Sequence, residues 1–549
     1  MPLRNSIRVA AATATISILS ACAHAEAGTA TQGSDVSIGR VEVTTIPFDP
    51  DLSVRSATYT PSGKVLVSYT DDDNADDRDR KLATMNDDGT GFRPFFAGRI
   101  PERPKDNGIR FMVFPDNKRI FLGDFILECT AVLEKCTDPK LLPVTYPAEI
   151  ADGEHVGHRW SEMIVAPDNR SIAWTTLLSN YSALVFTGEL RRADGGYVIA
   201  KPQIVSTLDP FRPDPDHPDG VLPQPVLGGE VKQFVHGGTA LSLVGSVRRD
   251  IPDSVVQYLA TGEREAITDT PGYTETTIFS PDERLGITMT TRFSPRSDPA
   301  ILGLLPRPYP DSLNMGLSMF AYTYGVTGVR GARPGNIGPA LIDIAASKSE
   351  DGYLGIDLST DPEWVFHSPM SWHPDGTKAL WPEGRREGGE RRIQVVHLPD
   401  YRPAAPVAAR PTPSNIPYGK TDLSVVKEFA KQSRDIDVKV YGRASGHIEY
   451  RRTPAKIVKT YVNFSDDGQS VYSGSEALQV NPQGNSTYVA KVALSGPKPG
   501  RMDLTVTFGP ISGNLPARIV FDHGADGQPA LRGFAEYDGR RLDVADLVP

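Results

Sequence analysis

Short apolar runs separated by tight polar turns recur along most of this chain. The segment Phe279–Leu285 reads FSPDERL, and Trp372–Leu380 reads WHPDGTKAL. Similar turns occur at Pro61, Pro115 and Pro167. Proline fixes φ, while Asp, Asn and Gly tolerate a tight bend, so each motif predicts a hairpin between two β-strands. The pattern therefore predicts an all-β fold.

The turns recur about every 40–50 residues, which is typical of a β-propeller, because a single blade cannot bury its own faces. A weaker turn at His236 fits between the stronger ones. The interval from Pro281 to Pro374 is twice the usual one, and the apolar segment Met319–Tyr324 lies within it. We therefore expect a seven-bladed propeller, with a six-bladed one as the alternative. An N-terminal strand within 36–48 is expected to complete the last blade.

The chain is 549 residues long, which predicts two or three domains. Residues 36–402 form the expected propeller, and 403–430 form a Pro-rich linker with a short helix. Alternating apolar positions over 431–549 predict a small β-sandwich. The Pro- and Asp-rich insertion Asp209–Pro225 is expected to be an irregular loop.

The N-terminus has the features of an export signal over residues 1–21: basic residues, then a short apolar run. Its end, Leu19–Cys22 (LSAC), resembles the cleavage motif of bacterial lipoproteins. The resemblance implies a lipidated Cys22 carrying palmitate, a tether over 22–35 and an outer-membrane anchor, with the protein facing the periplasm or the cell surface. An ordinary cleavage site beside the small residues Ala21 and Ala23 is the alternative.

The chain contains three cysteines. With Cys22 lipidated, Cys129 and Cys136 remain as a pair, and an oxidising compartment favours a disulfide between them. The net charge of -10 argues against a nucleic-acid-binding function.

The turn motifs resemble the repeat of TolB-like, WD40-like propellers. The segment Leu82–Gly91 (LATMNDDGTG) is similar to the acidic-glycine turn that ends the third strand of a blade in that family. The resemblance covers roughly residues 36–400 and implies an architecture. The same repeat occurs in envelope scaffolds, prolyl-oligopeptidase-type peptidases and polysaccharide lyases. No G-x-S-x-G motif is present, which disfavours the peptidase.

Residues just before the innermost strands of a propeller gather at the mouth of its central channel. Here these positions are rich in arginine and histidine, which suits charge-assisted hydrogen bonds to a sugar or peptide carboxylate. The alternative is that a channel mouth is polar simply because water enters it. The expected ligand-binding residues are Arg55, Arg110, Arg159, Glu230 and Glu275, and the candidate catalytic residues are His158, Tyr273 and His367.

Two classes of function follow. One is an envelope lipoprotein whose propeller binds a peptide, glycan or protein partner at the channel mouth, without cofactor or metal. The other is a polysaccharide lyase acting on acidic sugars, with a divalent metal or arginines neutralising the uronate and one of the candidate bases taking the proton. His236 and His373 lie at turns on the opposite face and are expected to be structural.

Overall fold

The computed structural model describes residues 36–547 apart from 72–75, 77, 102–110, 151–155, 160–162, 179–181, 294–299, 314–336, 351, 368, 432–434, 482–483, 510–519, 521–526 and 529. For residues 111, 156–159 and 547 only the backbone is described. No helix in this part of the chain is both long and apolar enough to cross a membrane.

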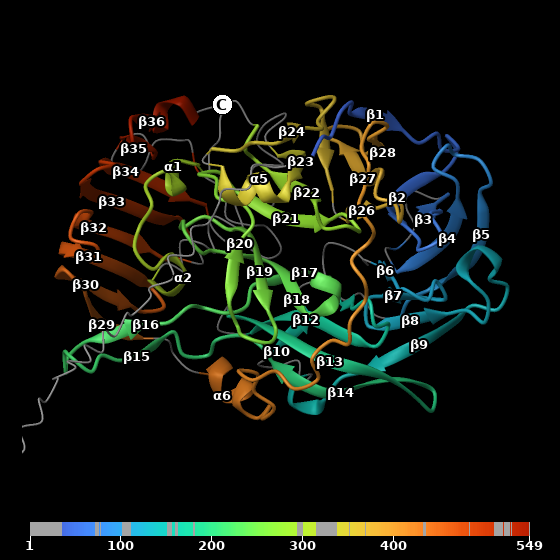
Figure 1. Ribbon diagram of the computed structural model, residues 1–549, viewed down its shortest axis with the longest axis horizontal. Coiled ribbons are helices and arrows are strands. Elements are labelled where there is room, and N and C mark those ends of the chain that lie inside the picture. Colours follow the sequence, from blue (N-terminus) through green and yellow to red (C-terminus); the bar gives the residue numbers. More distant parts are fainter. Residues whose placement is uncertain are drawn as a thin grey trace, which may run out of the picture.

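Antiparallel four-stranded sheets follow one another along the described part of residues 42–397, as in a β-propeller (Figure 1). The first three consist of β2 (Ser53–Tyr59), β3 (Val65–Thr70), β4 (Asp79–Met85) and β5 (Arg93–Arg99); β6 (Phe111–Val113), β7 (Arg119–Leu122), β8 (Phe125–Glu128) and β9 (Lys140–Thr145); and β10 (Val156–Arg159) with β11 (Ile164–Val165), β12 (Ser171–Leu178), β13 (Ala183–Ala193) and β14 (Gly196–Ile204). The outer strands β9 and β14 pair in parallel, so the second and third sheets are joined.

Three further sheets complete this region. They consist of β17 (Glu230–Val235), β18 (Ala240–Gly245), β19 (Asp253–Tyr258) and β20 (Arg264–Ala266); β21 (Thr274–Phe279), β22 (Leu285–Thr290), β23 (Gly338–Asp343) and β24 (Ile356–Asp357); and β25 (Trp364–Phe366) with β26 (Ser371–Trp372), β27 (Lys378–Arg385), β28 (Arg391–His397) and β1 (Glu42–Thr45). Because the first strand of the chain pairs with β28, the two ends of the region are joined, and the predicted N-terminal closing strand is confirmed.

The predicted turns join the first and second strands of their sheets. Two residues after the proline, each turn has a residue with positive φ: Gly63, Asn117, Asn169, Glu283 and Gly376. In all of these turns but the first, an aspartate follows the proline and stabilises the bend. Asp168, for example, accepts hydrogen bonds from the backbone N–H groups of Arg170 and Ser171 at 2.9 and 2.7 Å. Local chemistry therefore explains the repeat.

The long interval between Pro281 and Pro374 contains an insertion within the fifth sheet. Strands β22 and β23 pair directly, with Leu285 opposite Asp343, although they are far apart in the sequence. The described part of the insertion forms two short helices, α1 (Ala300–Gly303) and α2 (Pro310–Leu313), and α5 (Ile344–Ser349) follows β23. The segment Met319–Tyr324, which prompted the expectation of a seventh blade, lies outside the described residues.

The C-terminal region forms one eight-stranded antiparallel sheet, in which each strand pairs with the next, in place of the two packed sheets expected for a sandwich. Its strands are β29 (Ile436–Tyr441), β30 (Ser445–Arg452), β31 (Lys456–Ser465), β32 (Val471–Gln479), β33 (Ser486–Ser495), β34 (Gly500–Phe508), β35 (Arg532–Tyr537) and β36 (Arg540–Asp543). One face is buried in the same apolar cluster as Ile301, Leu305 and Leu313 of the fifth-sheet insertion. The propeller thus supplies the second layer, and alternation alone cannot distinguish this arrangement from a sandwich.

A buried ionic network joins the propeller to this sheet, and we call it the junction network. It contains Asp250, Arg307, Lys459, Tyr461, Glu476 and Tyr488, all with 3% exposure or less. Arg307 pairs with Asp250 and lies 3.5 Å from Glu476, and Lys459 pairs with Glu476 at 2.7 Å. The hydroxyls of Tyr461 and Tyr488 donate to the same carboxylate at 2.6 and 2.5 Å. Two cations and two carboxylates thus balance one another.

The insertion Asp209–Pro225 forms a hairpin, β15 (Phe211–Pro213) and β16 (Val221–Pro223), where an irregular loop was expected. Prolines are tolerated because they lie at strand ends of an isolated two-stranded ribbon. The hairpin contacts the C-terminal sheet: the His217 ring stacks on Tyr441 at 3.9 Å, and Asp219 accepts a hydrogen bond from the Tyr441 hydroxyl at 3.0 Å.

The Pro-rich segment 403–417, which we call the strap, lies along the turns of three sheets. Backbone N–H groups of Val407 and Arg410 donate to the carbonyls of Pro281 and Gly237, each at 2.8 Å. Beyond the strap, helix α6 (Val425–Lys431) packs into the apolar cluster of the second and third sheets. The expected linker is therefore docked on the propeller (Figure 1).

Candidate functional site at the channel wall

The first strands of the fourth and fifth sheets bring together two predicted residues, Glu230 and Glu275. Lys232 lies between them, with its Nζ 3.0 Å from Glu230 Oε1 and 3.3 Å from Glu275 Oε1. All three side chains are at most 7% exposed. We call these three residues the channel triad, and sequence reasoning missed its lysine.

A β-bulge positions each side of the triad. In β17 the register shifts between Val231 and Gln233, which leaves Lys232 as the extra residue. In β21 it shifts between Thr274 and Thr277, around Glu275. Bulges re-aim side chains and are frequent next to functional sites.

The same irregularity occurs in other inner strands. In β2 the register shifts between Val54 and Ser56, which leaves Arg55 as the extra residue, and in β10 it shifts between Val156 and Arg159, around His158. Bulges therefore coincide with predicted mouth residues in three sheets, and in the fourth sheet the bulge lies two residues after the predicted Glu230. Sequence patterns gave no signal for them, because a bulge adds one residue without changing the composition of a strand.

The triad carries one more carboxylate than cations. Glu275 Oε2 is buried and has no hydrogen-bond partner within the described part of the chain. A buried carboxylate oxygen without a donor is costly, and such atoms are normally satisfied by protein, water or ligand. The arrangement therefore favours binding of a cationic or N–H-bearing group.

The other predicted mouth residues have different surroundings. Tyr273 is fully buried, and its backbone N–H donates to Thr291 Oγ1 at 3.0 Å. His367 is half-buried with its ring over Gly384, where an added Cβ would lie 2.9 Å from Nε2. Arg110 lies outside the described residues, and for His158 and Arg159 only the backbone is described, so these assignments stay predictions.

Two histidines on the turn face connect neighbouring elements. His236 Nδ1 lies 2.8 Å from Glu283 Oε2, and its ring stacks on Tyr258. His373 Nδ1 lies 2.9 Å from Asp375, and its ring meets Tyr59 edge-on at 5.0 Å. These contacts link the turns of adjacent sheets, as expected for structural residues.

The predicted disulfide between Cys129 and Cys136 is confirmed, and it lies between β8 and β9. Among the residues that the structure describes, no group of three His, Cys, Asp or Glu side chains has an arrangement suited to a metal ion.

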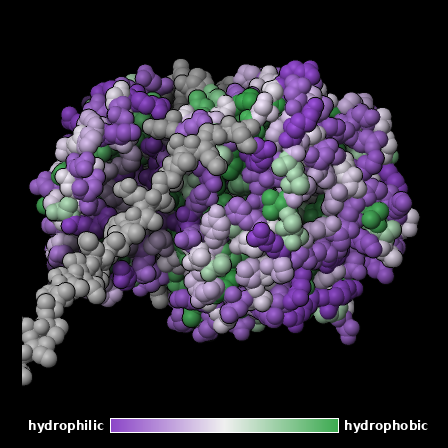
Figure 2. All heavy atoms as spheres, viewed as in Figure 1, coloured by the Kyte–Doolittle hydropathy of each residue, from purple (hydrophilic) through white to green (hydrophobic). Residues whose placement is uncertain are grey.

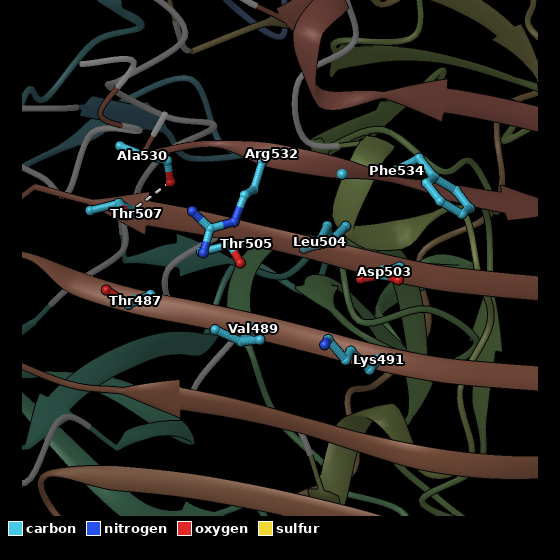
Figure 3. Close-up of a pocket in the computed structure, with 11 residues that line it drawn as sticks. Thr487, Val489, Lys491, Asp503, Leu504, Thr505, Thr507, Ala530, Arg532 and Phe534 are labelled. Carbon is cyan, nitrogen blue, oxygen red and sulfur yellow. Dashed lines mark hydrogen bonds between the residues drawn. The ribbon is translucent and has the colours of Figure 1, made fainter. Parts of the chain in front are cut away.

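A hollow lies on the outer face of the C-terminal sheet, across β33, β34 and β35 (Figure 3). Its volume is about 680 Å³, and its lining includes Thr505, Lys491, Arg532 and Phe534. On the face of the molecule seen in Figure 2, hydrophobic residues are scattered over a mainly hydrophilic surface.

No family model and no curated relative matches the chain. Among solved structures, it is similar to TolB from Acinetobacter baumannii, with 13% identity, a TM-score of 0.27, and coverage of 64% of this chain and 65% of that chain. It is also similar to an oligogalacturonate lyase in complex with manganese, with 11% identity, a TM-score of 0.35, and coverage of 65% and 93%. The β-propeller domain of the Trilobed protease from Pyrococcus furiosus matches with 8% identity, a TM-score of 0.27, and coverage of 74% and 95%. These likenesses concern the fold.

Proposed function

We propose that this chain is a lipid-anchored envelope protein whose six-bladed propeller binds a peptide or protein partner through a cationic group at the channel wall. The channel triad carries the proposal, because it combines two buried carboxylates with one lysine, and Glu275 Oε2 has no donor among the residues that the structure describes. Bulges at the triad support a binding role.

The burial of the triad limits the shape of the ligand. A group that reaches Glu275 must be slender, since the side chain is 4% exposed. A primary ammonium on an alkyl chain, such as a lysine side chain, meets this requirement and donates three hydrogen bonds. The ligand's remaining residues then contact the channel mouth.

Calorimetric titration with a lysine-containing tripeptide and its Nε-acetylated counterpart tests the binding mode. We expect the charged peptide to bind and the acetylated one to bind at least tenfold more weakly, and Glu275→Gln to remove that preference. Glu263→Gln, at an exposed position outside the triad, serves as the matched control. Equal affinities for both peptides would contradict the proposal.

The anchor is tested separately. We expect Cys22→Ser to abolish incorporation of radiolabelled palmitate and to release the protein from the membrane fraction. Unchanged labelling of this variant would show that Cys22 carries no lipid.

A further inference from the structure

A polar cleft of about 580 Å³ lies where the propeller meets the C-terminal sheet. On the propeller side, the loop between β18 and β19 contributes Arg248 and Arg249. The end of α5 and the segment after it contribute Ser347, Lys348, Ser349, Glu350, Gly352 and Tyr353. On the other side, the β35–β36 hairpin contributes Tyr537, Asp538 and Arg540. Small-molecule sites occur preferentially at such junctions.

The cleft is locally basic in an acidic chain. Its lining contains five cationic side chains, Arg248, Arg249, Lys348, Lys498 and Arg540, and three carboxylates, Asp269, Glu350 and Asp538. Lys348 also pairs with Glu265, outside the lining, at 2.9 Å, so cations exceed carboxylates by one in this group. The whole chain has a net charge of -10. A concave site with the opposite sign of charge favours an anionic ligand.

Two arginines share one aspartate at the propeller wall. Asp269 accepts from Arg249 Nε at 2.7 Å and from Arg248 Nη1 at 3.2 Å. Arg249 also donates to the carbonyls of Gly303 and Leu304, which fixes its guanidinium. Arg248 is 58% exposed, and since a guanidinium has five N–H donors, most of its donors are available.

The opposite wall presents an arginine from a tight turn. Tyr537 and Arg540 pair across a two-residue turn, in which Asp538 and Gly539 have φ of 50° and 78°. Arg540 is exposed and forms no ion pair with any residue that the structure describes. Its guanidinium therefore retains its full capacity for an anion.

The junction network keeps the two walls together. Asp250 follows Arg249 directly and pairs with the buried Arg307, which contacts Glu476 of the C-terminal sheet. The loop that bears the arginines is thus fixed to the sheet that bears Arg540. A rigidly supported site binds at lower entropic cost.

We propose that this junction cleft binds an anionic saccharide, with the guanidinium groups of Arg248 and Arg540 contacting its carboxylate or phosphate. The rings of Tyr353 and Tyr537 line the same cleft and offer apolar faces to a sugar ring. The site is separate from the channel triad, so this proposal does not depend on whether the channel binds a peptide.

The full chain is titrated calorimetrically with three probes: a hexuronate disaccharide, a hexose phosphate and a neutral disaccharide of the same length. We expect one or both anionic probes to bind and the neutral one to fail. Preference between the carboxylate and the phosphate identifies the anionic group. Affinity is expected to fall as ionic strength rises.

Arg248→Gln and Arg540→Gln are each expected to weaken binding about tenfold or more, as for the loss of a charged hydrogen bond. Arg451→Gln, an exposed arginine of β30 outside the cleft, is the matched control and should bind as the parent does. Failure of both anionic probes at millimolar concentration would overturn the proposal. An affinity equal to that of the parent protein in both Arg248→Gln and Arg540→Gln would also overturn it.

Discussion

The junction network and the channel triad are both buried, but their charges are organised differently. In the junction network, two cations face two carboxylates, and two tyrosine hydroxyls complete the hydrogen bonds of Glu476. In the triad, one lysine serves two glutamates, and Glu275 Oε2 has no partner among the described residues. We infer that a cluster in which cations and carboxylates are equal in number is structural, whereas the triad, in which carboxylates outnumber cations, receives a ligand.

Loss of Arg307 should produce the largest effect. Arg307→Met leaves Asp250 and Glu476 buried without their shared cation, and we expect a loss of about 3–5 kcal/mol in the free energy of unfolding. Denaturant unfolding measures it, with Arg451→Met as an exposed control expected to change stability by about 0.5 kcal/mol or less. Equal stability of Arg307→Met and Arg451→Met would contradict a structural role for the junction network.

Acid should weaken the same network. Burial alone would raise the pKa of Glu476, but the adjacent Lys459 and Arg307 lower it from 4.5 to about 2. The pKa of Glu476 is lower in the folded state than in the unfolded state. Its contribution to the free energy of unfolding is therefore present above pH 4.5 and is lost as the pH falls towards about 2. We expect the free energy of unfolding to fall by about 3 kcal/mol over this pH range. Unfolding measured from pH 6 to pH 2.5 tests this, and Glu476→Gln should show a correspondingly flatter profile.

Removing the lysine of the triad should cost less than removing Arg307. Lys232→Met leaves two neighbouring carboxylates without their lysine, and we expect a loss of about 3 kcal/mol, at the lower end of the cost of removing one partner of a buried pair. Thermal and denaturant unfolding measure the change. A loss as large as that of Arg307→Met would indicate that the triad, too, is primarily structural.

Glu275→Gln should have the smallest effect on stability. The substitution removes the excess charge and leaves Lys232 paired with Glu230, so we expect a change within about 1 kcal/mol. The matched substitution Glu476→Gln should destabilise by more, because it leaves Arg307 and Lys459 without their shared carboxylate. If Glu275→Gln and Glu476→Gln lower the free energy of unfolding equally, charge balance does not distinguish the channel triad from the junction network.

The sequence predicted what depends on local chemistry. The turns at Pro115 and Pro281 follow from Pro-Asp motifs, and the closing strand at the N-terminus follows from the repeat itself. The proximity of Glu230 and Glu275 follows from their equivalent positions before the inner strands.

What the sequence left out depends on contacts between distant segments. Lys459 lies on the inward face of β31 together with Ile457 and Tyr461, where a charged residue is tolerated because Glu476, from another strand, pairs with it. The C-terminal strands fit a sandwich or a single covered sheet equally well, since both require one apolar face. Bulges and the junction cleft likewise arise only when strands pair in three dimensions.

In the exposed part of the strap, the number of residues matters more than the identity of the side chains. Its contacts with the turns use backbone N–H groups, while the side chains of residues 404–411 are exposed. Substitutions there, other than to proline at Val407 or Arg410, leave these contacts intact. An insertion of one residue between these two positions would instead move every later contact out of register. Homologues of this chain should therefore vary in the composition of residues 404–411 while keeping the number of residues in the strap.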